Sequence, residues 1–121
     1  MIPKTFRKEL VLKPGEIITV FEEAFKDDFF AIDEIYTVWQ PGIEIYFYFD
    51  GSLFDIFESK IIKPDAQGYY KYSRSFLKYP LIITNDMLVV AKNTSNEEKQ
   101  VVVVIDGYLA PKSKFKIRPL V

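Results

Sequence analysis

Hydrophobic and polar residues alternate along most of this chain, in short runs separated by turn residues. The run at 43–49 is the clearest, because every second residue is Ile or Phe and the residues between them are Glu44, Tyr46 and Tyr48. A period of two is typical of a strand with one face in a core and the other toward water. The Gln-Pro-Gly sequence at 40–42 predicts a turn before it.

The same pattern predicts eight or nine strands, spaced roughly ten residues apart with turn residues between most of them. They are expected at residues 4–12, 17–21, 29–39, 43–49, 53–57, 81–84, 87–91 and 101–105, with an edge strand at 115–120. Residues 22–28 fit a short helix and a loop about equally well, and residues 61–77 are expected to be the least regular part. Asp33-Glu34 interrupts the alternation of its strand, which indicates a β-bulge.

Residues 101–108 read Val-Val-Val-Val-Ile-Asp-Gly-Tyr, and the first five have no polar face. β-Branched side chains suit a pleated surface better than a helix. This run therefore predicts a central strand, covered on both faces or covered on one face and paired in the middle of a sheet. Asp106-Gly107 is a turn dipeptide, so the strand is expected to stop there.

Many short strands with turns between them predict a β-sandwich or a barrel. A chain of 121 residues is long enough for one domain with a real core and too short for two comfortable ones. We therefore expect a single domain over residues 1–121, an all-β, eight- or nine-stranded antiparallel β-sandwich that is jelly-roll-like.

The composition excludes most kinds of catalytic centre. The chain has no Cys, which excludes disulfides, thiolate metal sites and cysteine nucleophiles. It also has no His, which excludes a Ser-His-Asp triad, a histidine base and the usual zinc, iron and copper sites. We therefore expect no enzyme activity and no cofactor.

The net charge and the hydropathy of the chain also limit which partners can be expected. The net charge is −1, which gives no electrostatic argument for binding nucleic acid. The first residues contain no apolar stretch typical of a signal peptide, and the longest apolar run is far too short to span a membrane. The expectation is a protein made in the cytoplasm, without membrane contact. Richness in Lys, Ile and Glu without Cys fits a thermophile.

Acidic residues are concentrated between Glu16 and Glu34, where seven carboxylates accompany the single basic residue Lys26. Converging carboxylates can bind Ca²⁺. Their spacing is not that of a calcium loop, and a solvated loop explains them more simply. The sequence leaves calcium binding open here.

Aromatic residues form a first candidate interaction surface. Tyr46 and Tyr48 lie on alternate positions between Glu44 and Asp50, so one face of that strand carries two rings among carboxylates. The other candidates are Trp39, Tyr69, Tyr70 and Tyr72. Such residues suit core packing or a subunit contact, which we favour, and exposed rings could alternatively stack on a sugar.

Basic residues form a second candidate surface. The last eleven residues contain no acid and four basic side chains, Lys112, Lys114, Lys116 and Arg118. They suit pairing with the acidic region, within the chain or between neighbouring subunits. They could also guard an exposed sheet edge, which is a common role for Lys.

Several segments together resemble small jelly-roll proteins of virus particles, namely the accessory head, vertex or fibre-base proteins of tailed phages and archaeal viruses. The segments are 12–16 (Leu-Lys-Pro-Gly-Glu), 39–43 (Trp-Gln-Pro-Gly-Ile), 49–51 (Phe-Asp-Gly) and 87–93 (Met-Leu-Val-Val-Ala-Lys-Asn), which leads into 101–107. The likeness is one of layout over most of the chain. It implies a structural protein in a symmetric assembly, with no catalytic residues to carry over. The layout also resembles carbohydrate-binding sandwiches, whereas the metal histidines of cupins are missing.

The sequence therefore predicts a structural or assembly protein that forms a homo-oligomer or contacts a larger protein shell, and the resemblance implies that it is incorporated in a virus particle. A carbohydrate-binding module is the alternative.

Overall fold

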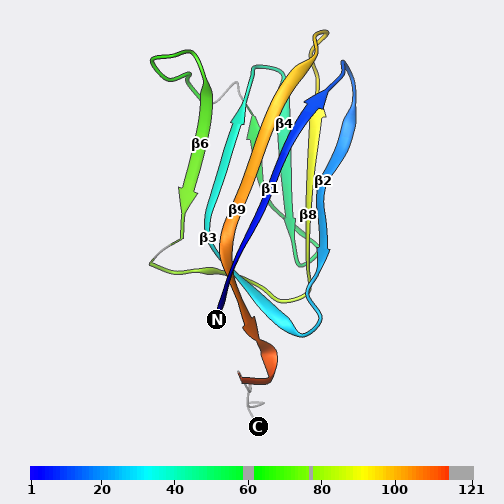
Figure 1. The fold of residues 1–121 in the computed structure, drawn as a ribbon. Coiled ribbons are helices and arrows are strands. Elements are labelled where there is room, and N and C mark those ends of the chain that lie inside the picture. The colour runs from blue at the N-terminus through cyan, green and yellow to red at the C-terminus, as the bar shows by residue number, and fades with distance from the viewer. Residues whose placement is uncertain (59–61, 77, 115–121) are drawn as a thin grey trace.

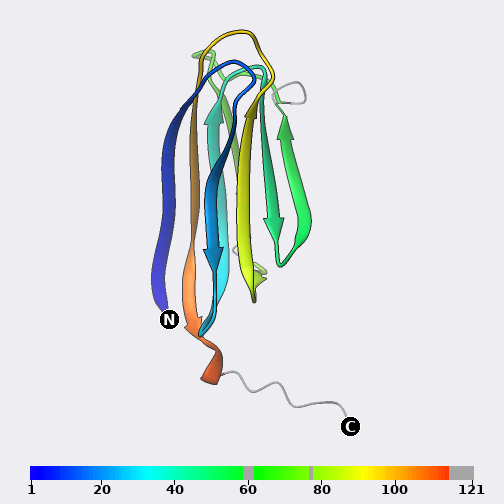
Figure 2. The same cartoon turned by 90° about the vertical axis from the view of Figure 1, so that its right-hand side faces the viewer.

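The computed structural model describes residues 1–58, 62–76 and 78–114 and folds them into a sandwich of two antiparallel sheets (Figure 1). Sheet A has the order β1-β9-β3-β6, with β7 also paired to β3. Its strands are β1 (Ile2–Leu12), β9 (Lys99–Pro111), β3 (Asp28–Trp39), β6 (Tyr70–Ser75) and β7 (Leu81–Ile83). Sheet B has the order β2-β8-β4-β5 and is seen face-on in Figure 2. Its strands are β2 (Ile17–Ala24), β8 (Asp86–Asn93), β4 (Ile43–Phe49) and β5 (Ser52–Glu58).

The pairing of the strands is that of a jelly roll. β1 pairs with β9, β2 with β8, β3 with β6 and β4 with β5, each antiparallel. The chain thus behaves as one long hairpin whose paired arms are rolled into two sheets. The predicted all-β, eight- or nine-stranded, jelly-roll-like sandwich is confirmed, with nine strands among the described residues. A 3-10 turn, η2 (Lys112–Lys114), follows β9.

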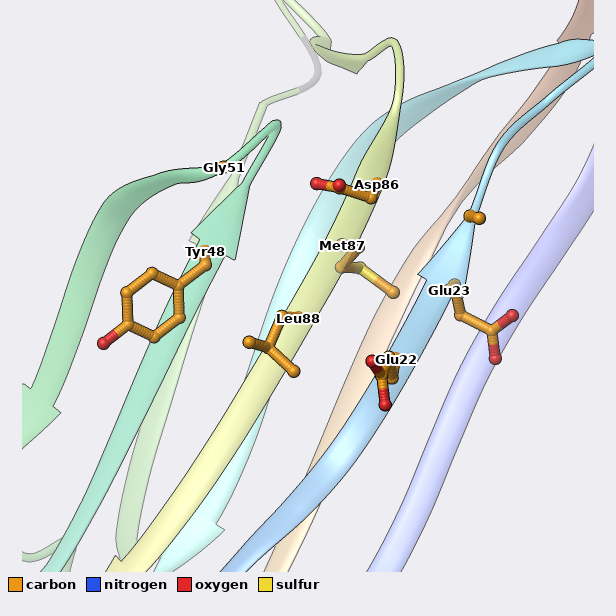
Figure 3. A pocket seen from close by; sticks show the side chains of 8 residues that line it. Glu22, Glu23, Tyr48, Gly51, Asp86, Met87 and Leu88 are labelled. Atoms are coloured by element: carbon orange, nitrogen blue, oxygen red, sulfur yellow. The ribbon is translucent and has the colours of Figure 1, made fainter.

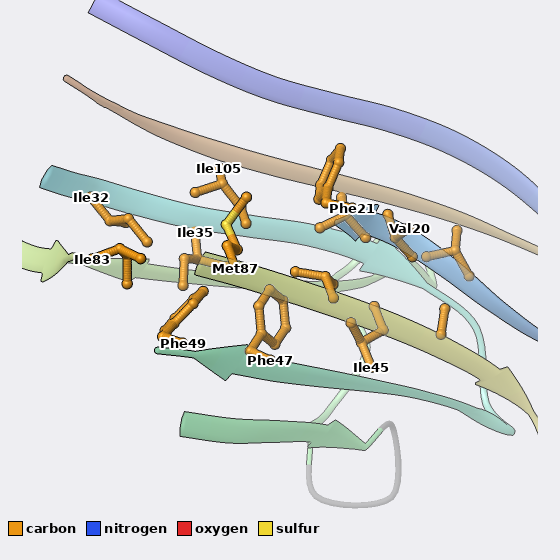
Figure 4. Packing of buried hydrophobic residues seen from close by; sticks show 14 of the residues in the cluster. Val20, Phe21, Ile32, Ile35, Ile45, Phe47, Phe49, Ile83, Met87 and Ile105 are labelled. Carbon is orange, nitrogen blue, oxygen red and sulfur yellow. The ribbon is translucent and has the colours of Figure 1, made fainter. Parts of the chain in front are cut away.

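The core lies between the sheets, where the inward side chains of both interdigitate (Figure 4). In β4 burial alternates strictly, with Ile43, Ile45, Phe47 and Phe49 buried and the residues between them half-buried. Side chains of sheet A and of sheet B meet in this layer, which excludes water from both inner faces. The alternation of buried and outward residues predicted from the sequence for this strand is therefore the one observed in the sandwich.

Strand β9 is central in sheet A, between β1 and β3, as predicted. Its Val101, Val103 and Ile105 are buried, while Val102 and Val104 are half-buried on the outer face. The strand is thus covered on one face and paired on both edges. This arrangement explains a run of β-branched residues without a polar face.

The predicted turn at Asp106-Gly107 is wrong, because β9 continues through both residues to Pro111. Gly107 lies opposite a bulge in β3, where the register shifts between Ile32 and Glu34. A Cβ atom at Gly107 would lie 2.2 Å from the carbonyl oxygen of Ala31. Glycine is therefore needed for close approach of two strands at this point. The bulge itself was predicted and is confirmed.

The remaining local predictions have different outcomes. The turns at 14–15, 41–42 and 50–51 are confirmed. The helix considered for 22–28 is wrong, because β2 extends to Ala24. Strand β6 was not predicted, since residues 61–77 were expected to be irregular. The edge strand predicted at 115–120 lies outside the described residues.

Candidate interaction surface on sheet B

The outer face of sheet B carries rows of apolar side chains. Residues directly opposite each other in neighbouring strands share a face. The register therefore places Val90, Tyr46 and Ile56 in one row across β8, β4 and β5. The next row contains Leu88, Tyr48 and Leu53. We call these six residues the apolar band.

The apolar band faces solvent. Leu53 is 50% exposed, and Ile17, on the adjacent edge strand β2, is 61% exposed. The other five members of the band are half-buried. Contiguous exposed apolar side chains rimmed by polar ones are typical of interaction sites.

Two hollows open on this face and share Tyr48. The larger, about 400 Å³, lies at one end of the sheet, between β2, β8 and the turn after β4 (Figure 3). Tyr48 and Leu88 line its apolar part, Glu22 and Asp86 supply carboxylates, and Glu23 and the buried Met87 also border it. We call it the acidic pocket. The shallower hollow, about 250 Å³, is lined by Ile17, Tyr46, Tyr48, Val90 and Lys92.

Unpaired negative charge surrounds the acidic pocket. Within the described part of the chain, the carboxylates of Glu22, Glu23 and Asp86 have neither an ion-pair nor a hydrogen-bond partner. At the opposite end of the band the register aligns Lys92, Glu44 and Glu58 in a third row. The rim of the band is therefore predominantly acidic.

Tyr46 is hydrogen-bonded within this face. Its hydroxyl donates to the carboxylate of Glu44. This hydrogen bond, with partial burial and the negative charges of Glu44 and Glu58, raises the pKa of Tyr46 to about 12. The hydrogen bond restrains the position of the Tyr46 hydroxyl, which preorganises the centre of the band.

The structure thus brings together three of the residues predicted as an interaction surface, Glu44, Tyr46 and Tyr48. Asp50, the fourth member of that strand face, has a different role. Its carboxylate accepts the backbone N–H groups of Thr84, Asn85 and Asp86 at 2.6 to 3.1 Å. Partial burial alone would raise the pKa of Asp50, but these N–H groups outweigh it and lower the pKa. Asp50 joins the β4–β5 turn to the β7–β8 connection.

The remaining aromatic candidates lie elsewhere. Trp39 is 1% exposed, so its proposed use as a stacking platform is wrong, because the last residue of β3 points into the core. Tyr70 and Tyr72 extend from β6 and pack against the core. Tyr69 is exposed, but it lines a small hollow beside the outer face of sheet A, with Val102 among its neighbours.

The basic candidate residues also differ in where they lie. The Nζ atom of Lys112 donates to the carbonyl oxygen of Phe25 at 2.8 Å and lies 5.7 Å from the ring centroid of Phe29. Lys112 therefore holds the end of β9 against the connection between β2 and β3. Lys114 is exposed, and Lys116 and Arg118 lie outside the described residues.

Residues 1–58, 62–76 and 78–114 contain no group of three or more acidic side chains placed to hold a metal ion. The acidic residues between Glu16 and Glu34 are dispersed over the sandwich. Glu22 is on the outer face of sheet B, whereas Glu34 accepts a hydrogen bond from Ser73 on sheet A. The same described residues include no helix that is long and apolar enough to cross a membrane.

The sequence interpretation missed the residues of the band that lie on β8 and β5. Leu88 and Val90 were assigned only to a strand, although residues 87–91 are apolar at every position. A strand that is apolar on both faces while its sheet has only one neighbour sheet must present one apolar face outward. The apolar run at 87–91 was therefore a signal for an outward apolar face, but it could be interpreted only once the order of the strands in the sheet was known.

No protein-family model matches the chain, and no curated protein matches it in sequence.

Proposed function

We propose that the protein is a non-enzymatic structural or assembly component that associates with further copies of itself through the outer face of sheet B. The observation that carries this proposal is the apolar band with its acidic rim. Tyr and large aliphatic side chains at the centre, with charges around them, match the composition of protein–protein contact surfaces.

The class of assembly that we propose is a virus particle, in which the protein would serve as a capsid decoration, vertex or fibre-base component. A jelly-roll sandwich with an apolar outer face supports this role, because such a face can be covered by a neighbouring subunit. The resemblance of the sequence layout to small virion proteins supports it as well. Neither argument requires catalytic residues.

The test is the oligomeric state of the purified chain, measured by analytical ultracentrifugation. We expect a defined oligomer at concentrations up to roughly 0.5 mM, a range that populates even a weak contact. Leu88→Glu, in the middle of the band, is expected to dissociate it. Val104→Glu is the matched control, because Val104 is a half-buried outward residue at the centre of sheet A. Circular dichroism confirms that both variants are folded.

A wild-type chain that stays monomeric over this whole range would overturn the proposal. Equal loss of association in Leu88→Glu and Val104→Glu would also contradict it, since the effect would then not be specific to sheet B.

Carbohydrate binding is a second candidate, and the acidic pocket favours it. Tyr48 offers a ring beside the unpaired carboxylates of Glu22 and Asp86, which could accept hydrogen bonds from sugar hydroxyls. The test is a glycan array, with Tyr48→Ala as the variant that should lose any signal. An array without signal for the wild-type chain removes this candidate. Two other candidate residues cannot contribute, because Trp39 is buried and the Asp50 carboxylate accepts backbone N–H groups of residues 84–86.

A further inference from the structure

A small hollow opens on the outer face of sheet A, away from the apolar band. It lies where β3 ends and where β6 and β9 begin, at the upper end of the molecule in Figure 1. Val38 and Val102, which are paired across β3 and β9, supply its apolar part, and Gln40, Gln100 and Tyr69 line it as well. Its volume is about 130 Å³. Pockets that enclose a whole ligand measure roughly 300–1,000 Å³, so this hollow suits one small ring.

The strand register explains why the three polar side chains meet. Gln100 and Gln40 each flank a buried residue of β9 or β3, so alternation turns both side chains outward. Tyr69 directly precedes Tyr70, whose partner in β3 is Trp39. Because Tyr70 packs against the core, Tyr69 faces outward, and it is 58% exposed. Three neighbouring strands thus bring two amides and a phenol ring to one place.

The loop before β6 holds Tyr69 in position. One carboxylate oxygen of Asp65 accepts the backbone N–H groups of Gln67 and Tyr69, at 3.0 and 2.9 Å. The backbone N–H of Asp65 donates to the carbonyl oxygen of Tyr69 at 2.9 Å. Lys71 forms an ion pair with Asp65 at 3.1 Å, and its Nζ atom lies 5.7 Å from the centroid of the Tyr69 ring. The ring is therefore presented from an ordered loop, beside a lysine whose charge is already paired.

The two glutamines also extend from fixed backbone. Gln100 lies within β9, opposite Val11 of β1. The carbonyl oxygen of Gln40 accepts the backbone N–H of Ile43 at 3.2 Å, which closes the turn before β4. Both side chains are exposed, and neither amide has a hydrogen-bond partner within residues 1–58, 62–76 and 78–114. Each amide therefore has two N–H donors and one carbonyl acceptor available to a ligand.

The lining of the hollow indicates the chemistry of its ligand. Among the described residues, no charged side chain lines it, so an ionic group would find no counter-charge there. Adjacent amides supply donors and acceptors together, which suits hydroxyl groups, since each hydroxyl both donates and accepts. The exposed ring and the two valines offer apolar surface to C–H groups. A neutral sugar ring combines these features, with hydroxyls around its edge and C–H groups on its faces.

We infer that Tyr69, Gln40 and Gln100, with Val38 and Val102, form a binding site for one ring of a neutral sugar. The ring of Tyr69 stacks on the C–H groups, and the two amides hydrogen-bond adjacent hydroxyls. The site lies on sheet A, so it shares no residue with the face proposed for self-association or with the acidic pocket. The inference therefore goes beyond the proposed function and does not depend on it.

Titration of the full chain with sugars, followed by nuclear magnetic resonance, tests this inference. The probes are methyl glycosides of neutral hexoses, pentoses and N-acetylhexosamines at up to roughly 50 mM, because a single ring in an open hollow binds in the millimolar range. We expect at least one probe to shift the side-chain amide signals of Gln40 and Gln100. The variants Gln40→Leu and Gln100→Leu identify these signals, since each variant lacks one of them.

Substitutions within the hollow should weaken this binding. We expect Tyr69→Ala to raise the dissociation constant at least 10-fold, because the stacking surface is lost. Gln40→Leu/Gln100→Leu should raise it by a similar factor, because bound hydroxyls would lose their partners. Circular dichroism confirms that both variants are folded.

Tyr79→Ala is the matched control. Tyr79 is likewise exposed, at 77%, and the Nζ atom of Lys78 lies 5.8 Å from its ring centroid, but it does not line the hollow. This variant should bind the sugar as the wild type does. Equal weakening in Tyr79→Ala and Tyr69→Ala would contradict the inference, because the effect would then not be specific to the hollow.

The remaining outcomes are equally distinct. If none of the glycosides shifts either amide signal, the inference is overturned. If adenosine or N-acetylglycine methylamide shifts these signals and no glycoside does, the assigned ligand class is wrong. If a glycoside binds, but Tyr48→Ala loses it and Tyr69→Ala keeps it, the sugar belongs to the acidic pocket and this inference fails. A monomeric wild-type chain would overturn the proposed self-association and leave the sugar site standing.

Discussion

The hydroxyl of Tyr46 donates a hydrogen bond to the carboxylate of Glu44, two residues earlier on the same outward face of β4. This bond requires the protonated phenol. It is the main reason that the pKa of Tyr46 rises from 10.0 to about 12, with partial burial second. The pKa of Tyr46 is therefore higher in the folded protein than in the unfolded chain. The contribution of this hydrogen bond to the free energy of folding is fully present below pH 10 and is lost as the pH rises through about 12.

The first prediction concerns the titration of this tyrosine. In the wild type, the ultraviolet absorbance of phenolate should show a component near pH 12 that Tyr46→Phe lacks. Glu44→Gln should shift that component to lower pH, because the charged acceptor is removed. Glu22→Gln, which alters a carboxylate without this contact, should leave it in place. A late component that persists in Tyr46→Phe would contradict the assignment.

Asp50 leads to a second prediction, on stability. Asp50→Asn is expected to lower the free energy of unfolding by about 1 kcal/mol, a modest value because the group is solvent-exposed. The substitution removes the charge that binds the three N–H groups of residues 84–86, while asparagine tolerates the positive φ of 51° at this position. Urea unfolding at neutral pH measures the difference.

The pH dependence supplies the control for this prediction. The folded pKa of Asp50 is lowered, so its contribution is present above pH 3.8 and is lost as the pH falls through the folded pKa. The wild type and Asp50→Asn should therefore approach equal stability in acid. Asp86→Asn, at an exposed carboxylate without a partner in the described chain, should change stability little at either pH. A difference that grows in acid would refute the role of the charge.

The two Asp-Gly dipeptides illustrate how far the sequence could predict the fold. At 50–51, both residues have positive φ and form the predicted hairpin turn. At 106–107, the same dipeptide lies inside β9. Local propensity is identical in the two places, and the difference arises from the β3 bulge opposite Gly107, a contact far away in sequence. Strands with clear alternation were predictable, whereas interruptions that depend on a partner strand were not.

The candidate surface was predictable only in part, for a related reason. The alternation of β4 placed Glu44, Tyr46 and Tyr48 on one face, and the structure keeps them there. Their neighbours Leu88 and Val90 come from β8, and no local pattern indicates that β8 lies beside β4. A surface built across strands becomes visible only when their order and register are known.

Gly107 provides a third prediction. Gly107→Ala should lower the free energy of unfolding by about 3 kcal/mol or more, because the new Cβ would meet a backbone oxygen that the bulge holds in place. Gly15→Ala is the control. Gly15 has positive φ but no atom within 4 Å of an added Cβ, so only about 1 kcal/mol of backbone strain is expected. Equal costs at the two sites in urea unfolding would contradict the role assigned to the bulge.

The last prediction concerns a substitution of Thr37 that should raise the stability of the fold. Its side chain is fully buried on the inner face of β3, and its hydroxyl has no hydrogen-bond partner among the described residues. A buried hydroxyl without a partner costs about 1 to 3 kcal/mol in desolvation. Thr37→Val keeps the β-branched shape and removes the hydroxyl, so we expect the free energy of unfolding to rise by about 1 kcal/mol, seen as a higher urea midpoint with an unchanged slope. Thr37→Ser, which keeps the hydroxyl and loses the methyl group, should instead be less stable than the wild type. A destabilised Thr37→Val would mean that the hydroxyl makes a stabilising contact in solution.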